Sequence, residues 1–391
     1  MAQRKTSVNG IKETLTQSVY PWREGNQFEL HVNAEAFYPK MINAIAKSKQ
    51  YVFLEMYLFE SGYIAIQFIQ QFVQAAHRGV KVCVLLDAFG SMKLNVSDRK
   101  KLRQGGVELC IYNPLKFKFG DARRNLFRDH RKVLIIDNAV CFVGGAGISD
   151  VFLSQKNGQL GWRDTMLNVK GECVKDWCQV FMHTWIFCNG NDIKLNASES
   201  QIIENGTSGR IACSLGIGGQ GITRSLVKRI RIASHRVFIS SAYFVPTRKV
   251  RKELKKAALR GVDVRLLVPG FKSDHPSIRY LSHRFYYRLL KAGVKIYEYQ
   301  PRFMHQKAIL CDEWLSIGSS NIDRWNLRWN LEVNQEIDNW DFSNKLALQF
   351  EEDFKESKNI IYEEWINRNW FFKLMTHILE RLDLFIDKFV R

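Results

Sequence analysis

Two stretches, DHRKVLIIDNAVCFVGGAGIS (129–149) and MHQKAILCDEWLSIGSSNID (304–323), decide how the 391-residue chain folds. Near its start, each has a histidine, then a lysine two residues later and an aspartate seven residues after the histidine. An apolar run follows in both and leads to Gly-Gly or Gly-Ser. Because this order of polar and apolar residues occurs twice, the chain contains an internal repeat.

The repeat extends upstream of these stretches. In both copies, helix-like segments alternate with short apolar runs, which is typical of α/β units. We therefore predict an α/β fold, a tandem repeat of two α/β/α sandwich domains with mixed, largely parallel sheets and a functional site between the halves. The matched segments are INAIAKSKQYVFLEMYLF (42–59) with LVKRIRIASHRVFISSAYF (226–244), AAHRGVKVCVLL (75–86) with AALRGVDVRLLV (257–268), and GGVELCIYNP (105–114) with AGVKIYEYQP (292–301).

Composition shifts suggest the domain boundaries. Residues 189–209 are polar and rich in Gly, Asn and Ser, as in a linker. We predict a first domain over 1–188, a second over 210–358 and an amphipathic helix over 359–391. From Phe371 onward, apolar residues recur at helical spacing, so this helix packs on the body or lies in a membrane interface.

The net charge of +19 indicates an anionic partner, either a nucleic acid or a membrane surface. The eight cysteines are scattered without a CxxC pair, which favours a reducing, cytosolic compartment. Residues 1–26 lack the apolar core of a signal peptide, and no apolar run is long enough to span a bilayer. We expect any membrane contact to be peripheral.

The repeated His-x-Lys spacing suits phosphodiester chemistry. On a strand, residues two apart share one face, so His130 lies with Lys132 and His305 with Lys307. One neutral imidazole can attack phosphorus while a protonated one supplies the leaving oxygen with a proton. The lysines can hold the non-bridging oxygens, and neither a metal nor a cofactor is required.

The aspartates of the two motifs are more ambiguous. Asp137 and Asp312 belong to the candidate catalytic set by their spacing. Each also falls at a predicted turn after the apolar run, where aspartate commonly hydrogen-bonds the backbone. Catalytic and turn-forming roles both remain open.

The paired motifs resemble those of the phospholipase D superfamily, and further segments are similar to bacterial cardiolipin synthases of the B type, which lacks N-terminal membrane spans. The resemblance covers about residues 20–370 and implies two phospholipase D-type domains with the active site at their interface. The segments that carry it are WREGNQFEL (22–30), LLDAFGS (85–91), GGAG (144–147), GWRDT (161–165) and GSSNIDRWNLRWNLEVN (318–334).

The resemblance implies a phosphatidyl transfer through a phosphohistidine. We assign His130 as nucleophile and His305 as acid, with the reverse order open. It further implies that Asp164 and Glu332 orient the histidines, often across the halves, although either could be an ordinary ion-pair partner. Gly147 stands where the family usually has Asn. The residues expected to face the phosphate are Ser319, Asn321 and Asn330.

The implied substrates are phosphatidylglycerol and other anionic phospholipids, met at the cytoplasmic face of the bacterial cell membrane. A lipid hydrolase or another phosphatidyltransferase would share every motif; a nuclease or a non-catalytic binder fits less well, and no nucleic-acid partner is expected. A basic and aromatic insertion precedes His130, suited to headgroup docking, to a solvated loop or to base stacking. Its cations are Lys116, Lys118, Arg123, Arg124 and Arg128.

Overall fold

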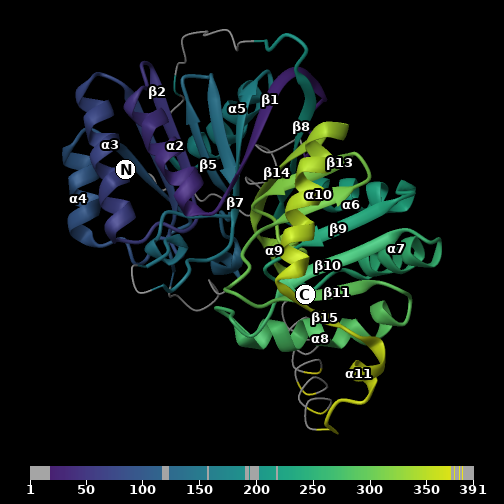
Figure 1. Ribbon diagram of the computed structural model, residues 1–391. Coiled ribbons are helices and arrows are strands. Elements are labelled where there is room, and N and C mark those ends of the chain that lie inside the picture. Colours follow the sequence, from purple (N-terminus) through teal and green to yellow (C-terminus); the bar gives the residue numbers. More distant parts are fainter. Residues whose placement is uncertain are drawn as a thin grey trace.

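One mixed sheet joins the two repeats in this computed structural model. It has 15 strands in the order β15-β11-β10-β9-β12-β13-β14-β8-β1-β7-β6-β5-β2-β3-β4. Reading outward from β1 and from β8, the strands of the two repeats follow the same order, so the halves are related as a pseudo-dimer (Figure 1). The residues that the structure describes are 18–116, 123–155, 158–189, 193, 202–216, 219–370, 374, 378 and 381.

The first half contributes the strands on one side of the sheet's centre. Short 3-10 turns at Arg124–Leu126 and Asp150–Phe152 lie in its connections. Its elements are β1 (Arg23–Val32), α2 (Ala34–Ala46), β2 (Tyr51–Met56), α3 (Tyr63–His77), β3 (Lys81–Asp87), α4 (Val96–Gln104), β4 (Glu108–Tyr112), β5 (Lys132–Ile136), β6 (Val140–Gly144), β7 (Thr165–Gly171) and α5 (Cys173–Asn189).

The second half repeats this order and adds a strand at its outer edge. Its elements are β8 (Thr207–Leu215), α6 (Gly221–Ile232), β9 (Arg236–Ser240), α7 (Arg248–Leu259), β10 (Asp263–Pro269), α8 (Pro276–Leu290), β11 (Lys295–Tyr299), β12 (Ala308–Cys311), β13 (Trp314–Gly318), α9 (Arg324–Trp329), β14 (Leu331–Asp338), α10 (Trp340–Lys355), β15 (Ser357–Ile360) and α11 (Tyr362–Ile366).

The prediction of a largely parallel sheet is wrong. Only the pairs β2–β3, β3–β4, β9–β10 and β10–β11 are parallel, and the other ten pairs in the sheet are antiparallel. The motif strands cause this, because β5 and β12 return antiparallel to β2 and β9. Each then continues through a hairpin. Helical crossovers through α3, α4, α7 and α8 join the four parallel pairs.

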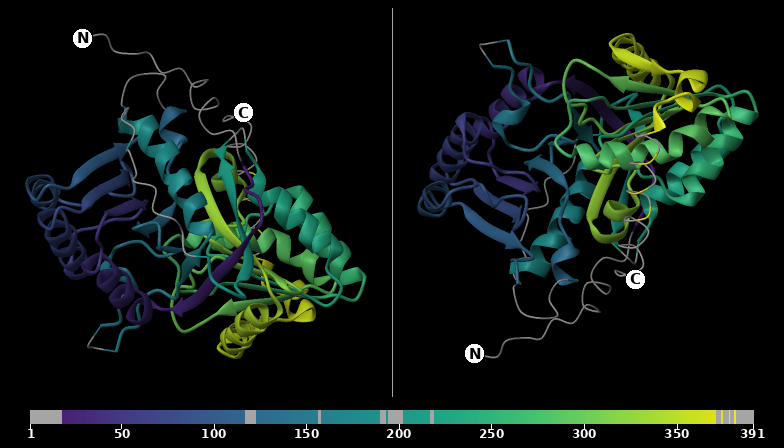
Figure 2. Two further views of the ribbon diagram at one scale, coloured as in Figure 1. Left: turned by 90° about the horizontal axis from the view of Figure 1, so that it is seen from above. Right: turned by 90° about the horizontal axis from the view of Figure 1, so that it is seen from below.

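Alternating apolar residues place a core on each face of the sheet. On β2, Phe53 faces a core shared by both halves, whereas Val52 and Leu54 face a core of the first half alone. Trp177 of α5 and Phe350 of α10 fill the shared core, which therefore fastens the halves together. Figure 2 shows the remaining helices of the two halves at opposite ends of the molecule.

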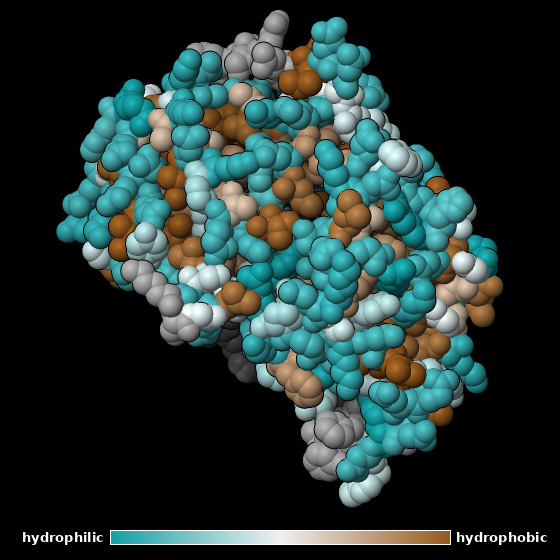
Figure 3. Space-filling view, in the orientation of Figure 1, coloured by the Kyte–Doolittle hydropathy of each residue, from teal (hydrophilic) through white to brown (hydrophobic). Residues whose placement is uncertain are grey.

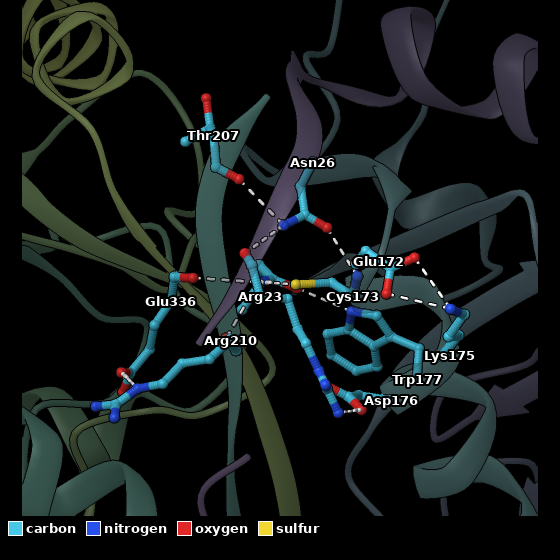
Figure 4. A network of polar contacts seen from close by, with 11 residues as sticks. Arg23, Asn26, Glu172, Cys173, Lys175, Asp176, Trp177, Thr207, Arg210 and Glu336 are labelled. Carbon is cyan, nitrogen blue, oxygen red and sulfur yellow. Dashed lines mark hydrogen bonds and ion pairs between the residues drawn. The ribbon is translucent and has the colours of Figure 1, made fainter. Parts of the chain in front are cut away.

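The seam between β1 and β8 depends on side chains. The two strands pair at only two registered positions with a shift between them. The amide nitrogen of Asn26 donates to the carbonyls of Arg23 (2.7 Å) and Thr207 (3.1 Å), and its oxygen accepts from the N–H of Cys173 (2.7 Å). Arg23 also forms two 3.0 Å contacts with Asp176 of α5 (Figure 4). These bonds tie both strands to one helix.

Two predicted boundaries differ from the observed elements. β8 begins inside the predicted linker 189–209, most of which lies outside the described residues. The segment 359–391 is not one helix, because Ser357–Ile360 pairs with β11 and α11 starts only at Tyr362. Most of the predicted amphipathic face also lies outside the described residues; Leu374 and Ile378 are helical and exposed.

Candidate active site

The two histidines lie at the same edge of the sheet. Lys132 begins β5 opposite Met56, the last residue of β2, so His130 sits at the carboxyl end of a parallel strand. In the second half, Ala308 begins β12 opposite Ser240 at the end of β9, and His305 and Lys307 come just before it. The sequence repeat therefore brings equivalent motifs to equivalent ends of the two half-sheets.

Each histidine-bearing segment is anchored to the opposite repeat. The backbone N–H of His130 donates to the carbonyl of Leu331 at 3.0 Å. The N–H of His305 donates to the carbonyl of Arg163 at 2.8 Å. Arg163 also forms a buried bidentate pair with Asp353 of α10, with contacts of 2.8 and 3.2 Å. Side chain and backbone thus hold the two halves in one register around the histidines.

His130 faces a carboxylate of the second repeat. Its Nδ1 lies 2.9 Å from Oε1 of Glu332, which is fully buried on β14. The hydroxyl of Ser319 donates to the other oxygen of Glu332 at 2.5 Å and accepts from the N–H of Val333 at 3.0 Å. Ser319, predicted to face phosphate, thus hydrogen-bonds the Glu332 carboxylate.

His305 forms the reciprocal pair with the first repeat. Its Nδ1 lies 2.6 Å from Oδ2 of Asp164, and the N–H of Thr165 donates to Oδ1 at 2.7 Å. A Cβ at Gly145 would lie 2.5 Å from the same oxygen, so a glycine is required for the carboxylate to fit. Asp164 and Glu332 therefore orient the histidines crosswise, each from the half that does not supply its partner.

The lysines are buried beside the histidines. The ammonium group of Lys132 donates to the carbonyl of His130, and that of Lys307 to the carbonyl of His305. Burial is the largest cause that lowers the pKa of Lys132 to about 7 and that of Lys307 to about 8. Two buried ammonium groups of this kind form a site that favours an anion.

Burial also favours the neutral form of both imidazoles. Burial lowers the pKa of His130, although the carboxylate of Glu332 acts to raise it. Burial also lowers the pKa of His305 well below the ordinary value, and the positive charge of Lys307 lowers it further. Burial raises the pKa of Asp164 to about 6. Since both Nδ1 atoms face carboxylates, both Nε2 atoms remain available for chemistry.

Aromatic side chains lie around the histidines. They were not predicted as site residues from the sequence. The ring of Tyr57 lies 4.6 Å from that of His130. Trp162 and Phe303 lie 5.3 and 5.6 Å from His305. Tyr57 directly follows β2. Its position at the carboxyl end of a parallel strand is the feature of the sequence that could have predicted it as a site residue. These rings pack beside the imidazoles, which are 8% (His130) and 6% (His305) exposed.

The two remaining residues predicted to face phosphate differ in their surroundings. Asn321 is fully buried, and neither its Oδ1 nor its Nδ2 has a hydrogen-bond partner in the described protein. The amide nitrogen of Asn330 donates to Oδ1 of Asn326 at 3.2 Å. In the first half, a Cβ at Gly147 would lie 2.5 Å from the carbonyl oxygen of Leu58. Only the second half therefore offers an amide here.

Asp137 and Asp312 lie away from the histidines, at the other ends of β5 and β12. Both have positive φ angles, 55° and 51°. The carboxylate of Asp137 accepts from three backbone N–H groups before and at the start of β2, at 2.7 to 2.8 Å, and Asp312 does the same before β9, at 2.9 to 3.0 Å. Their placement corrects the catalytic interpretation and supports the turn-forming one.

The basic insertion is only partly at the surface. Lys116 and Arg123 are exposed, whereas Lys118 lies outside the described residues. Arg124 is half-buried in the 3-10 turn. Arg128 is buried, lies 3.6 Å from Asp87 and donates to a main-chain carbonyl, so its assignment as a surface headgroup contact is wrong.

Two α/β repeats that share one sheet, with a His-x-Lys from each and crosswise carboxylates, define a phospholipase D-type protein. The sequence matches the family described as "Cardiolipin synthase, PLD-like domain" at residues 41–162 and 226–355. The chain belongs to this family and is an enzyme of the phosphatidyltransferase class. The prediction from the paired motifs is confirmed at this level.

Named relatives agree with this membership, and a solved structure has a similar fold. The chain is 35% identical to a cardiolipin synthase of Geobacillus kaustophilus, over 89% of the chain and 70% of that protein. It is 31% identical to a cardiolipin synthase of Clostridium perfringens, over 89% of the chain and 74% of that protein. Its fold is similar to that of phosphatidylserine synthase from Haemophilus influenzae, with a TM-score of 0.68, 14% identity and 98% of each chain covered.

Proposed function

We propose that the chain is a cardiolipin synthase that joins two phosphatidylglycerol molecules and releases glycerol. The observation that carries this proposal is the crosswise pairing of His130 with Glu332 and of His305 with Asp164. Two oriented imidazoles beside two ammonium groups form a set suited to double displacement at phosphorus. Neither half holds a complete set.

In the first step, Nε2 of His130 attacks phosphorus, and the bond between phosphorus and the oxygen of the headgroup glycerol breaks. His305 gives its proton to that oxygen, and glycerol leaves. The imidazolium form of His305 is stabilised by Asp164 and by the bound phosphodiester anion. Lys132 and Lys307 neutralise the non-bridging oxygens as charge develops on them.

In the second step, His305 removes the proton from a hydroxyl group of a second phosphatidylglycerol. The resulting oxygen attacks phosphorus, the bond to Nε2 of His130 breaks, and cardiolipin forms. The amide of Asn321 is suited to hold one phosphate oxygen through both steps, because its polar atoms are buried without protein partners. Asn330 directly precedes β14, the strand that carries Glu332.

We propose that the site meets these substrates at a bilayer surface, on the cytoplasmic side of the cell membrane. Phe89, 55% exposed, follows β3, and Phe271, 75% exposed, follows β10, so both repeats present an apolar side chain at the catalytic edge. In Figure 3, apolar residues lie in small groups among hydrophilic ones. Of the helices described, none is both long and apolar enough to cross a membrane.

The test is product analysis by mass spectrometry after mixing purified chain with phosphatidylglycerol liposomes. We expect cardiolipin and glycerol in equal amounts. Phosphatidic acid alone would instead show that water is the acceptor and that the chain is a hydrolase of the same chemical class. Cleavage of an oligonucleotide with no lipid turnover would replace the proposal with a nuclease.

A further inference from the structure

A second positively charged feature lies outside the catalytic site. A groove of about 1010 Å³ runs between α7 and α8 and reaches the first residue of α9, Arg324. Nine of its thirteen lining residues are Arg or Lys, and none is Asp or Glu. We call it the basic groove. The cations that α7 contributes to it are Arg248, Lys249, Arg251, Lys252, Lys255 and Lys256.

The six α7 cations form one continuous stripe along the helix. Their spacing of 0, 1, 3, 4, 7 and 8 residues places them on a single face, where like charges repel at i,i+4. Arg248 and Lys249 also occupy the first turn, which has no acidic residue and where the helix dipole disfavours cations. Within the described part of the chain, none of the six lies in an ion pair. Among the described residues, this charge is therefore uncompensated.

The groove also holds cations at its base. The guanidinium groups of Arg251 and Arg284 lie 4.5 and 4.4 Å from the centre of the Phe285 ring. Burial and four neighbouring arginines lower the pKa of Arg251 to about 10. Stacking on a buried ring fixes the two guanidinium groups in place, which reduces the entropy lost when they bind an anion.

The first repeat provides an internal comparison. Its helix α3 occupies the position of α7 in the repeat, and its sequence YIAIQFIQQFVQAAH contains neither Lys nor Arg. The stripe is therefore not needed to build this fold. It is a property of the second repeat alone, in a helix that begins at the catalytic edge because it follows β9.

We propose that the basic groove binds the phosphate groups of anionic phospholipids and docks the second repeat on an anionic bilayer. This extends the proposed function, because the catalytic edge and the start of the groove then meet one surface. Leu259, 72% exposed, and the exposed Tyr287 lie among the cations, and such apolar side chains suit the boundary between headgroups and acyl chains better than a nucleic acid groove.

The test is co-sedimentation of the full chain with vesicles of equal parts phosphatidylcholine and phosphatidylglycerol. The groove variant is K249Q/K252Q/K256Q, which changes three exposed lysines that form no ion pair with any residue that the structure describes. We expect its vesicle affinity to fall on the order of 100-fold, with little binding to pure phosphatidylcholine in any form. Thermal unfolding should be unchanged or shifted upward, since like charges are removed.

The matched control is K47Q/K49Q/K170Q, which lowers the net charge equally with exposed lysines at the opposite edge of the sheet. It should bind the vesicles like the unaltered chain. Equal losses in both variants would overturn the proposal, because net charge alone would then explain binding. The proposal would also be overturned if the groove variant lost binding to a single-stranded oligonucleotide but bound vesicles like the unaltered chain.

Turnover of detergent-dispersed phosphatidylglycerol separates this proposal from the proposed function. The groove variant should keep the rate of the unaltered chain in detergent, where no bilayer is present. A chain that bound vesicles through the groove but turned over no lipid would contradict the synthase assignment and leave the docking surface standing.

Discussion

At the scale of single residues, each histidine of the candidate site contacts one carboxylate. Asp164 and Glu332 are fully buried, and each contacts an Nδ1 atom of the other repeat. A carboxylate in this position fixes the tautomer of the ring and stabilises its protonated form. The roles of the two acids are therefore separable from substrate binding.

Replacing either acid with its amide tests this dependence. D164N and E332Q keep the volume of the side chain but remove its charge, and the amide can present the wrong tautomer to the histidine. We expect kcat to fall by about 10²–10⁴-fold with little change in KM. Steady-state kinetics on folded protein, with circular dichroism as control, measures this. Near-normal kcat in either variant would contradict the orienting role.

The buried lysines predict how activity depends on pH. Free enzyme loses ammonium charge as the pH rises through about 7 for Lys132 and about 8 for Lys307. Because the protonated lysines attract the phosphodiester, kcat/KM should decline across this range. A pH profile of kcat/KM checks this, and a profile that rises steadily to pH 9 would rule out the assignment.

At the scale of elements, the motif aspartates set where strands begin. Asp312 adopts a left-handed conformation and accepts three N–H bonds at the entrance to β9. Burial alone would raise its pKa, but these N–H groups lower it. Its contribution to stability is therefore present near neutral pH and is lost as the pH falls through the lowered value.

The variant D312A should lose about 1–3 kcal/mol of unfolding free energy, because it removes the acceptor at a positive φ. D312N should lose less, since Asn tolerates that conformation. Urea denaturation followed by fluorescence measures both. Turnover per folded molecule should stay normal; a selective loss of kcat in stable D312N would restore a catalytic role.

Some features of the helices and strands could be predicted from the sequence, and others could not. The two halves and the place of the histidines at strand ends were predictable, because the repeat aligns both motifs. The direction of the strands was not predictable. Apolar runs such as VLII and AILC have the same pattern whether β5 and β12 run parallel or antiparallel to their neighbours. Tyr57 and Trp162 were missed because an aromatic residue beside a strand usually belongs to the core.

At the scale of the whole molecule, one chain supplies both histidines and both carboxylates of the candidate site. The shared core, the seam at Asn26 and the Arg163–Asp353 pair hold the two halves together. A mixture of two inactive full-length variants, H130A and H305A, should therefore recover no activity, because each chain builds its own site. Recovery after mixing under native conditions would mean that two chains share sites.

The central claim is that two histidines act in sequence through a covalent intermediate. The most direct measurement is peptide mass spectrometry of the H305A variant after reaction with phosphatidyl-p-nitrophenol, whose leaving group needs no acid. We predict stoichiometric release of nitrophenolate and a phosphatidyl group on the peptide that contains His130, which persists because no base activates the acceptor. The absence of an adduct on any histidine would contradict the mechanism.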